Sequence, residues 1–182
     1  MSTATMTKDL TCENKTHHSG GKFLTFSIAG KNYGVEILRV QEIIGMMDIT
    51  PVPRTPKFVK GVINLRGKII PIIDLRLKFG MEAAERTQET CIIVVDVGNI
   101  KMGTIVDKVS EVLNIAAENI EDTPSFGVNV DTKFILGMGK TNENVTILLN
   151  IREVLTQSDT IAVLAAAEQG ISDIQERSKK NG

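Results

Sequence analysis

The chain has 182 residues with a formal net charge of -1; 42% are hydrophobic, 4% are aromatic and Trp is absent. This hydrophobic content excludes general disorder, and the core must be built from Ile, Val and Leu. The charge balance excludes a basic surface for nucleic acid, and no apolar run approaches the roughly 20 residues that a membrane span requires.

Residues 1–21 are rich in Ser, Thr, Lys, Asn and Gly, and we expect them to form a flexible leader. The segment lacks an apolar signal region, which predicts a cytoplasmic protein. Both histidines, His17 and His18, lie in it without other ligand types nearby, so no metal site is predicted. Cys12 and Cys91 are expected to be reduced thiols.

The folded part is expected to begin at Phe23, with a strand over 23–28, a turn at Ala29-Gly30 and a second strand. In the next stretch, Ile37, Val40 and Ile44 are spaced by three and four residues. This spacing fits either a helical turn or a continued strand, and periodicity does not decide between them.

Residues 62–65 and 68–70 are predicted to be two strands joined by a tight turn at Arg66-Gly67. Asp74 is expected to cap a short helical piece that Gly80 ends. Another strand is predicted over 91–97. Residues 159–182 are expected to form a C-terminal helix and tail, with Ile161, Leu164, Ile171 and Ile174 on roughly one side.

The first part of each half matches at a fixed offset of 69 residues, from Phe23 with Ile92 to Ile44 with Leu113. At that offset Phe23 matches Ile92, Gly34 matches Gly103, and Glu42 matches Glu111. Residues 58–62 and 72–76 then match 134–138 and 148–152 at a slightly larger offset. Matched glycines and blocks in the same order predict an internal duplication.

Each half consists of short strands and turns, which suits a small closed barrel without free strand edges. The predicted fold is therefore all-β, with two barrels side by side and a groove between them. We expect a domain over 22–158, with the first barrel at about 22–85 and the second at about 86–158. Exchange of strands between the barrels is left open.

The residues present argue against an enzyme. No histidine remains in the predicted folded part as a base or ligand, and there is no Gly-x-Ser-x-Gly elbow. Gly139-Lys140-Thr141 resembles the end of a phosphate loop, but Phe134 stands where the first glycine is needed. We therefore predict no catalytic, cofactor-binding or metal-binding residues.

Three blocks, at 34–43, 60–76 and 103–113, carry a resemblance to a known family. They read GVEILRVQEI, KGVINLRGKIIPIIDLR and GTIVDKVSEVL, and the second is the most distinctive. The chain resembles the CheW chemotaxis coupling (adaptor) protein family from about Phe23 to Leu155.

The resemblance implies two five-stranded Src-homology-3-like barrels around a shared core. It implies a non-enzymatic adaptor that couples chemoreceptors, the methyl-accepting chemotaxis proteins, to the CheA histidine kinase. One barrel would bind the CheA regulatory domain, and the groove between barrels would bind the cytoplasmic tip of a chemoreceptor. Such a protein is expected to be monomeric alone and recruited to receptor arrays at the membrane.

The family pattern assigns partner binding to seven positions, which are Val40, Glu42, Gly61, Arg66, Ile92, Gly103 and Val112. Each has a structural alternative. The aliphatic residues would serve equally as core, and the glycines as backbone requirements. Glu42 and Arg66 would then form only a surface salt bridge.

Three other functions are alternatives. The chain would fit a CheW-like coupling protein of a non-swimming pathway, such as pilus motility, because the partners differ rather than the fold. A small-ligand sensor would need polar groups that converge on a cavity, and the sequence shows no such cluster. A hydrolase would have to use scattered carboxylates without a histidine in the fold.

Overall fold

The computed structural model describes residues 18–98, 100–124 and 132–180. Residues 1–17 of the expected leader lie outside the described residues. The first half holds β1 (Gly21–Ile28), β2 (Lys31–Glu36), the 3₁₀ turn η1 (Ile37–Arg39), β3 (Val40–Gly45), β4 (Val59–Leu65), β5 (Lys68–Asp74) and α1 (Leu75–Lys78). The second holds β6 (Cys91–Asp96), β7 (Lys101–Val106), β8 (Lys108–Ile115), η2 (Ala117–Asn119), β9 (Ile120–Glu121), β10 (Ile135–Thr141), β11 (Asn144–Leu149) and α2 (Gln157–Lys180).

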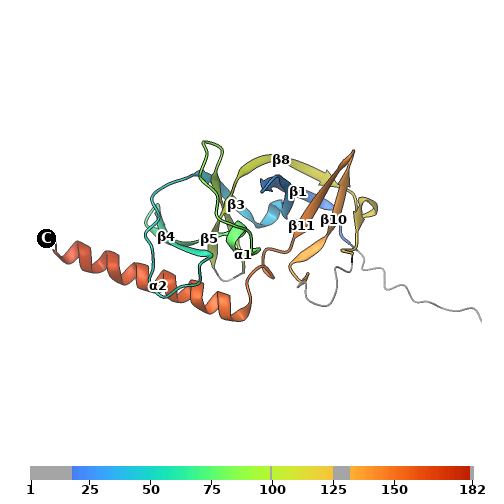
Figure 1. Ribbon diagram of the computed structural model, residues 1–182. Coiled ribbons are helices and arrows are strands. Elements are labelled where there is room, and N and C mark those ends of the chain that lie inside the picture. The colour runs from blue at the N-terminus through green and yellow to red at the C-terminus, as the bar shows by residue number, and fades with distance from the viewer. Residues whose placement is uncertain (1–17, 99, 125–131, 181–182) are drawn as a thin grey trace, which may run out of the picture.

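The strands form two Src-homology-3-like barrels that lie side by side (Figure 1). Barrel I is the sheet β8-β1-β2-β11-β10-β9, and barrel II is the sheet β3-β6-β7-β5-β4. The hairpin β1–β2 therefore lies among strands of the second half, and the hairpin β6–β7 lies among strands of the first half. Each hairpin joins its barrel through one antiparallel and one parallel pairing.

Each barrel is closed by the chain that follows its outer strand. After β3, Thr50 exchanges two backbone hydrogen bonds with Val62 of β4, at 2.8 and 2.9 Å. After β8, the short strand β9 pairs with β10 in the same way. The edges of the sheets are thus paired within the chain.

The strand registers confirm the predicted internal duplication. Phe23 of β1 pairs with Leu113 of β8, and their matches at the offset of 69, Ile92 and Ile44, pair in barrel II. Both pairings then contain a β-bulge at the same place. The pairings β4–β5 and β10–β11 also share a bulge, at Gly61 and Gly137.

The central part of β6 is apolar on both faces because both faces are buried. In β6, Ile92 and Val94 point into barrel II, whereas Ile93 and Val95 enter a core that the two barrels share. Alternate residues of a strand point to opposite faces, so a continuous apolar run is required here. Phe23 of β1 fills barrel I in the same way.

The turns and caps that the local sequence predicted are present in the structure. The Asp74 carboxylate accepts hydrogen bonds from the backbone N–H groups of Arg76 and Leu77, at 2.9 and 3.3 Å, and so caps α1. For the segment around Ile37 and Val40, the spacing fits either a helical turn or a strand, and the structure contains both, one after the other. The segment makes the 3₁₀ turn η1 and then the strand β3.

The helix α2 runs along barrel II and extends past it (Figure 1). Thr156 and Asp159 form a capping box, in which each side chain accepts a hydrogen bond from the other's backbone N–H. The buried side chains are Val163 and Ala166, which join the shared core. Of the predicted apolar side, Ile161, Leu164 and Ile171 are exposed, and the side chain of Ile174 lies outside the described residues.

Candidate functional site

Glu42 and Arg66 form a bidentate ion pair at one end of barrel II. The guanidinium Nη1 and Nη2 donate to the carboxylate Oε1 and Oε2 at 3.2 and 2.8 Å. The Glu42 side chain is 27% exposed and that of Arg66 is 77% exposed. The pair therefore offers an oriented guanidinium to solvent, backed by a partly buried carboxylate.

The hairpin β4–β5 positions Arg66. Its turn places Arg66 at φ 53° and Gly67 at φ 83°, and the side chain of Asn64 accepts a hydrogen bond from the N–H of Gly67 at 2.9 Å. Glu42 follows the bulge between β3 and β6, and lies opposite Val94. The fold thus holds two residues 24 positions apart at the same end of the barrel.

A hollow of about 320 Å³ opens beside this ion pair, and we call it the barrel II hollow. Its lining includes Glu42, Leu65, Arg66, Lys68, Ile70 and Lys101. Ile70 also belongs to the cluster that fills barrel II, so the hollow is the open end of the barrel interior. The floor is apolar and the rim is charged.

The two predicted glycine sites have tight surroundings, which are backbone atoms at Gly61 and side-chain atoms at Gly103. A Cβ on Gly61 would lie 2.0 Å from the carbonyl oxygen of Thr50, and φ there is 136°. A Cβ on Gly103 would lie 2.3 Å from Cδ1 of Ile72, inside barrel II. These contacts give both glycines a structural role that does not require a partner.

The three predicted aliphatic sites lie in different environments. Ile92 is fully buried inside barrel II, so an effect of Ile92 on a partner would be indirect. Val40 is half-buried against the shared core. Val112 lies on β8 of barrel I and is 47% exposed.

The fold therefore brings together Glu42 and Arg66, buries Ile92 in the cluster that fills barrel II, and places Val112 on the other barrel. Exposed apolar side chains missing from the predicted set include Leu38 and Ile43, at 90% and 46% exposed. A sequence signal existed for Ile43, because Val112 is its match at the offset of 69. Both occupy the same position on the outer strand of their barrel.

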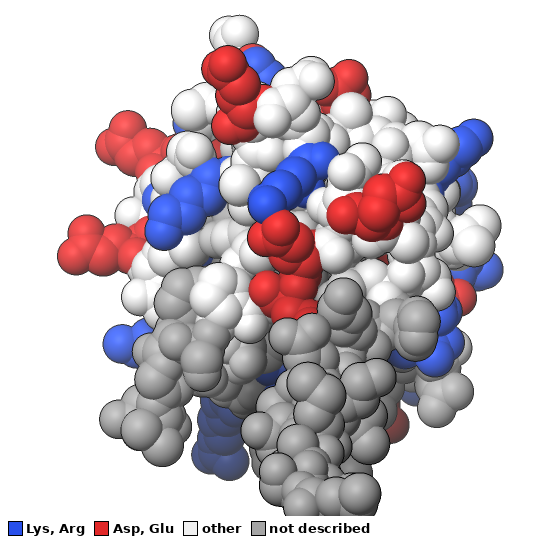
Figure 2. Space-filling view, turned by 90° about the vertical axis from the view of Figure 1, so that its right-hand side faces the viewer, with Lys and Arg blue, Asp and Glu red and all other residues white. Residues whose placement is uncertain are grey.

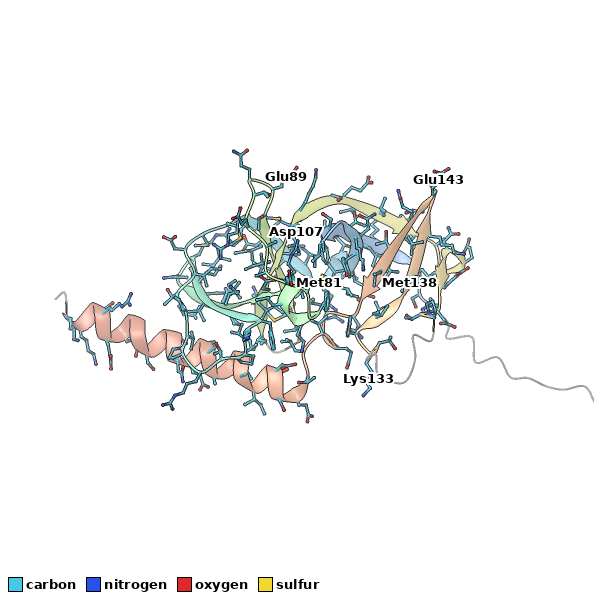
Figure 3. The ribbon with its side chains drawn as sticks, in the orientation of Figure 1. Met81, Glu89, Asp107, Lys133, Met138 and Glu143 are labelled. Carbon is cyan, nitrogen blue, oxygen red and sulfur yellow. The ribbon has the colours of Figure 1, made fainter. Side chains whose placement is uncertain are left out.

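Asp107 connects the two barrels near the middle of the molecule (Figure 3). Its carboxylate accepts from the N–H of Ala29, at the β1–β2 turn, at 2.9 Å and forms an ion pair with Arg76 of α1. Because one carboxylate is bonded to both segments, it stabilises the junction between the barrels.

The described residues show little chemistry of other kinds. They contain no cluster of three or more His, Cys, Asp or Glu side chains that could hold a metal ion. Burial raises the pKa of the Cys91 thiol, which disfavours its reactive thiolate.

None of the helices among the described residues is long and apolar enough to cross a membrane. On the face seen in Figure 2, Lys and Arg lie interspersed with Asp and Glu.

Comparisons with known proteins agree with this architecture. The family model described as "CheW-like domain" matches residues 22–159. Chemotaxis protein CheW of Klebsiella aerogenes is 41% identical over 144 residues, which cover 79% of this chain and 87% of the relative. Chemotaxis protein CheW of Bacillus subtilis is 37% identical over 142 residues, which cover 78% and 87%.

A solved structure extends the likeness to three dimensions. The crystal structure of the scaffolding protein TtCheW from Thermoanaerobacter tengcongensis superimposes with a TM-score of 0.70 at 37% sequence identity. The match covers 77% of this chain and 95% of that one. With its duplicated strand order and its match over residues 22–159, the chain belongs to the CheW-like domain family.

Proposed function

We propose that this chain is a non-enzymatic chemotaxis adaptor that couples chemoreceptors to the CheA histidine kinase. The observation that carries the proposal is the Glu42–Arg66 pair, which is exposed, bidentate and absent from the matching position of barrel I. There, Glu111 and Asn142 stand in place of Glu42 and Arg66. Because the barrel fold forms without the pair, recognition of a partner explains it better than stability does.

An adaptor needs separate apolar patches with polar rims rather than a catalytic centre. Ile43, beside Glu42 on β3, supplies an apolar contact in barrel II, and Val112 supplies one on β8 of barrel I. In this proposal, one barrel binds the CheA regulatory domain, and the groove between barrels binds the cytoplasmic tip of a receptor. Weak contacts at two surfaces become firm through multivalency in a receptor array.

The other predicted positions support these surfaces from within. Gly61 and Gly103 allow the close backbone and side-chain approaches on which barrel II depends, and Ile92 belongs to the cluster that fills this barrel. The chain is expected to be a monomer by itself and to join receptor arrays at the membrane only through its partners.

The test is a reconstitution of the purified chain with CheA and receptor-bearing membranes, with kinase autophosphorylation as the readout. Glu42→Ala and Arg66→Ala are expected to lose receptor control of the kinase while their circular dichroism is unchanged. The matched controls are Glu121→Ala and Lys140→Ala, which break an exposed ion pair on barrel I and are expected to retain coupling.

Coupling by both site variants at the level of the parent would contradict this interface. If the parent chain binds neither CheA nor chemoreceptors, the adaptor assignment fails for this pathway. The same assay with the kinase and receptors of a pilus-motility system would then test the nearest alternative.

A further inference from the structure

More cationic than anionic side chains line the barrel II hollow. Arg66, Lys68 and Lys101 all line it, whereas Glu42 is the one carboxylate in its lining. Neither lysine has a carboxylate within 4.0 Å among the described residues. Asp96, which lies opposite Lys101 in the β6–β7 ladder, accepts instead from the N–H of Gly98 at 2.7 Å.

The strand register explains why the cations converge. Lys101 projects on the same side of β7 as Gly103, which faces Ile72 inside the barrel. Lys68 lies two residues before Ile70, whose side chain is buried in the same interior. Both lysines are thus at the open end of rows of inward-pointing residues.

Comparison with barrel I shows whether the barrel fold itself requires cations at this end. The matching registers place Asn32 at the position of Lys101, and Asn142 and Asn144 at the positions of Arg66 and Lys68. The Asn142–Glu143 turn, with Glu143 at the tip of its hairpin in Figure 3, has the same left-handed first residue as the Arg66–Gly67 turn. Three neutral amides therefore occupy the same barrel end that carries three cations in barrel II.

Arg66 is paired with Glu42, but Lys68 and Lys101 bring two further positive charges to the same hollow without an ion-pair partner among the described residues. Like charges that converge destabilise a fold, so stability does not explain the two lysines. The volume of the hollow is near the lower end of the range of small-molecule sites, about 300 to 1,000 Å³. Its apolar floor of Leu65 and Ile70 lowers the effective dielectric beside the charges, which strengthens attraction for an anion.

We propose that the barrel II hollow binds a small phosphate-bearing anion between Lys68, Lys101 and Arg66. A phosphate group has three terminal oxygens that accept from cations in different directions, whereas a carboxylate has two in one plane. The lysine ammoniums act as point charges on the phosphate, and Arg66 shares its fork between the ligand and Glu42. The ligand thus competes with Glu42 for the guanidinium and changes the surface offered to a protein partner.

The test uses the purified full chain and pyrophosphate as the probe, at constant ionic strength. Calorimetry is expected to show one saturable site. In two-dimensional NMR the amides that shift on titration are expected to be those of the β4–β5 turn and the starts of β5 and β7. Neither readout involves receptor or kinase, so a negative result here leaves the proposed adaptor function untouched.

The variant Lys68→Asn/Lys101→Asn installs the residues that barrel I has at these positions. It is expected to weaken pyrophosphate binding about tenfold or more, because charge-assisted contacts are lost. The matched control Lys22→Asn/Lys57→Asn removes the same charge from exposed lysines outside the hollow, and is expected to bind like the parent.

Equal weakening in both double variants would show that net charge alone attracts the anion, and would overturn the site. Shifts spread over many surface lysines, or no saturable binding at millimolar pyrophosphate, would also overturn it. Binding to the parent that citrate matches in affinity would overturn the assignment to phosphate. If the site variant unfolds, the NMR map of the parent decides by itself.

Discussion

The Nζ atom of Lys78 lies 2.6 Å from the Asp159 carboxylate and so joins α1 to the first turn of α2. Both side chains are largely buried, at 18% and 15% exposed. The ammonium also lies 4.7 Å from the ring centroid of Phe58, in a cation–π contact. One lysine thus holds the C-terminal helix against barrel II through a charge pair and a ring.

This pair makes the docking of α2 dependent on pH. Burial alone would raise the pKa of Asp159, but the hydrogen bonds from Lys78 and from the N–H and hydroxyl of Thr156 offset it and lower the pKa overall. A lowered pKa contributes stability that is fully present above the unfolded-state value, about 3.9, and is lost as the pH falls through the folded-state pKa.

We therefore expect Asp159→Asn to lower the free energy of unfolding by about 1 to 3 kcal/mol at pH 7. The difference from the parent should shrink as the pH falls below about 4 towards the lowered pKa of the folded state, where the parent carboxylate becomes protonated as well. Thermal unfolding followed by circular dichroism at several pH values measures both quantities. Glu168→Gln, at an exposed position of α2, is the control and should show neither effect.

Gly61 and Gly67 both have positive φ but differ in the space around them. Gly61→Ala is expected to cost at least about 3 kcal/mol, because its Cβ would collide with the Thr50 carbonyl that closes barrel II. Gly67→Ala meets no atom within 4 Å and should cost only about 1 kcal/mol, from backbone strain. Urea unfolding gives both values. A folded Gly61→Ala chain of parental stability would contradict the predicted collision.

Gly103 can be tested against its neighbour Ile72 by a double-mutant cycle. Gly103→Ala places a methyl group against Cδ1 of Ile72 and should cost about 1 to 3 kcal/mol. Ile72→Val removes that Cδ1 and should cost about 0.5 to 1.5 kcal/mol by itself. The double variant is expected to lose less than the sum, since the methyl group then has room. Strict additivity would show that the collision is relieved elsewhere, for example by Cγ2 of Ile92.

Val112 and Val145 are both about half exposed on barrel I, at 47% and 53%. Replacing either by Ser should change the free energy of unfolding by no more than about 0.5 kcal/mol. Val112→Ser is expected to weaken receptor control of CheA in the reconstituted assay, whereas Val145→Ser should not. Equal behaviour of the two variants would mean that exposure of Val112 serves no partner.

Local features of the fold could be predicted because their causes are close in sequence. The hairpin turn at Arg66-Gly67 and the Asp74 cap both depend on side chains within three residues. The duplication was visible because paired glycines and charges persist at one offset. The family resemblance, and not the duplication, pointed to Glu42 and Arg66. A surface salt bridge between them was one of the alternatives left open by the sequence, and the structure shows that the two side chains do pair.

Features that depend on long-range register could not be predicted in the same way. The convergence of Lys101 with Arg66 requires β7 to pair in parallel with β5, which no local pattern encodes. The contact of Lys78 with Asp159 spans 81 positions. The buried side of α2 was also missed, because Val163 and Ala166 pack more closely than the larger residues on the predicted side.

The exchange of the hairpins β1–β2 and β6–β7 means that neither half of the chain contains a complete barrel. A fragment cut near residue 85 keeps β1 and β2 but loses β8 and β11, the strands that pair with this hairpin among the described residues. The two halves of the chain supply each other's missing strands. The arrangement is therefore that of a domain-swapped dimer whose two subunits are joined into one polypeptide. Because strands from both halves make up each barrel, we expect unfolding to be a single cooperative transition, in which damage to either barrel destabilises both.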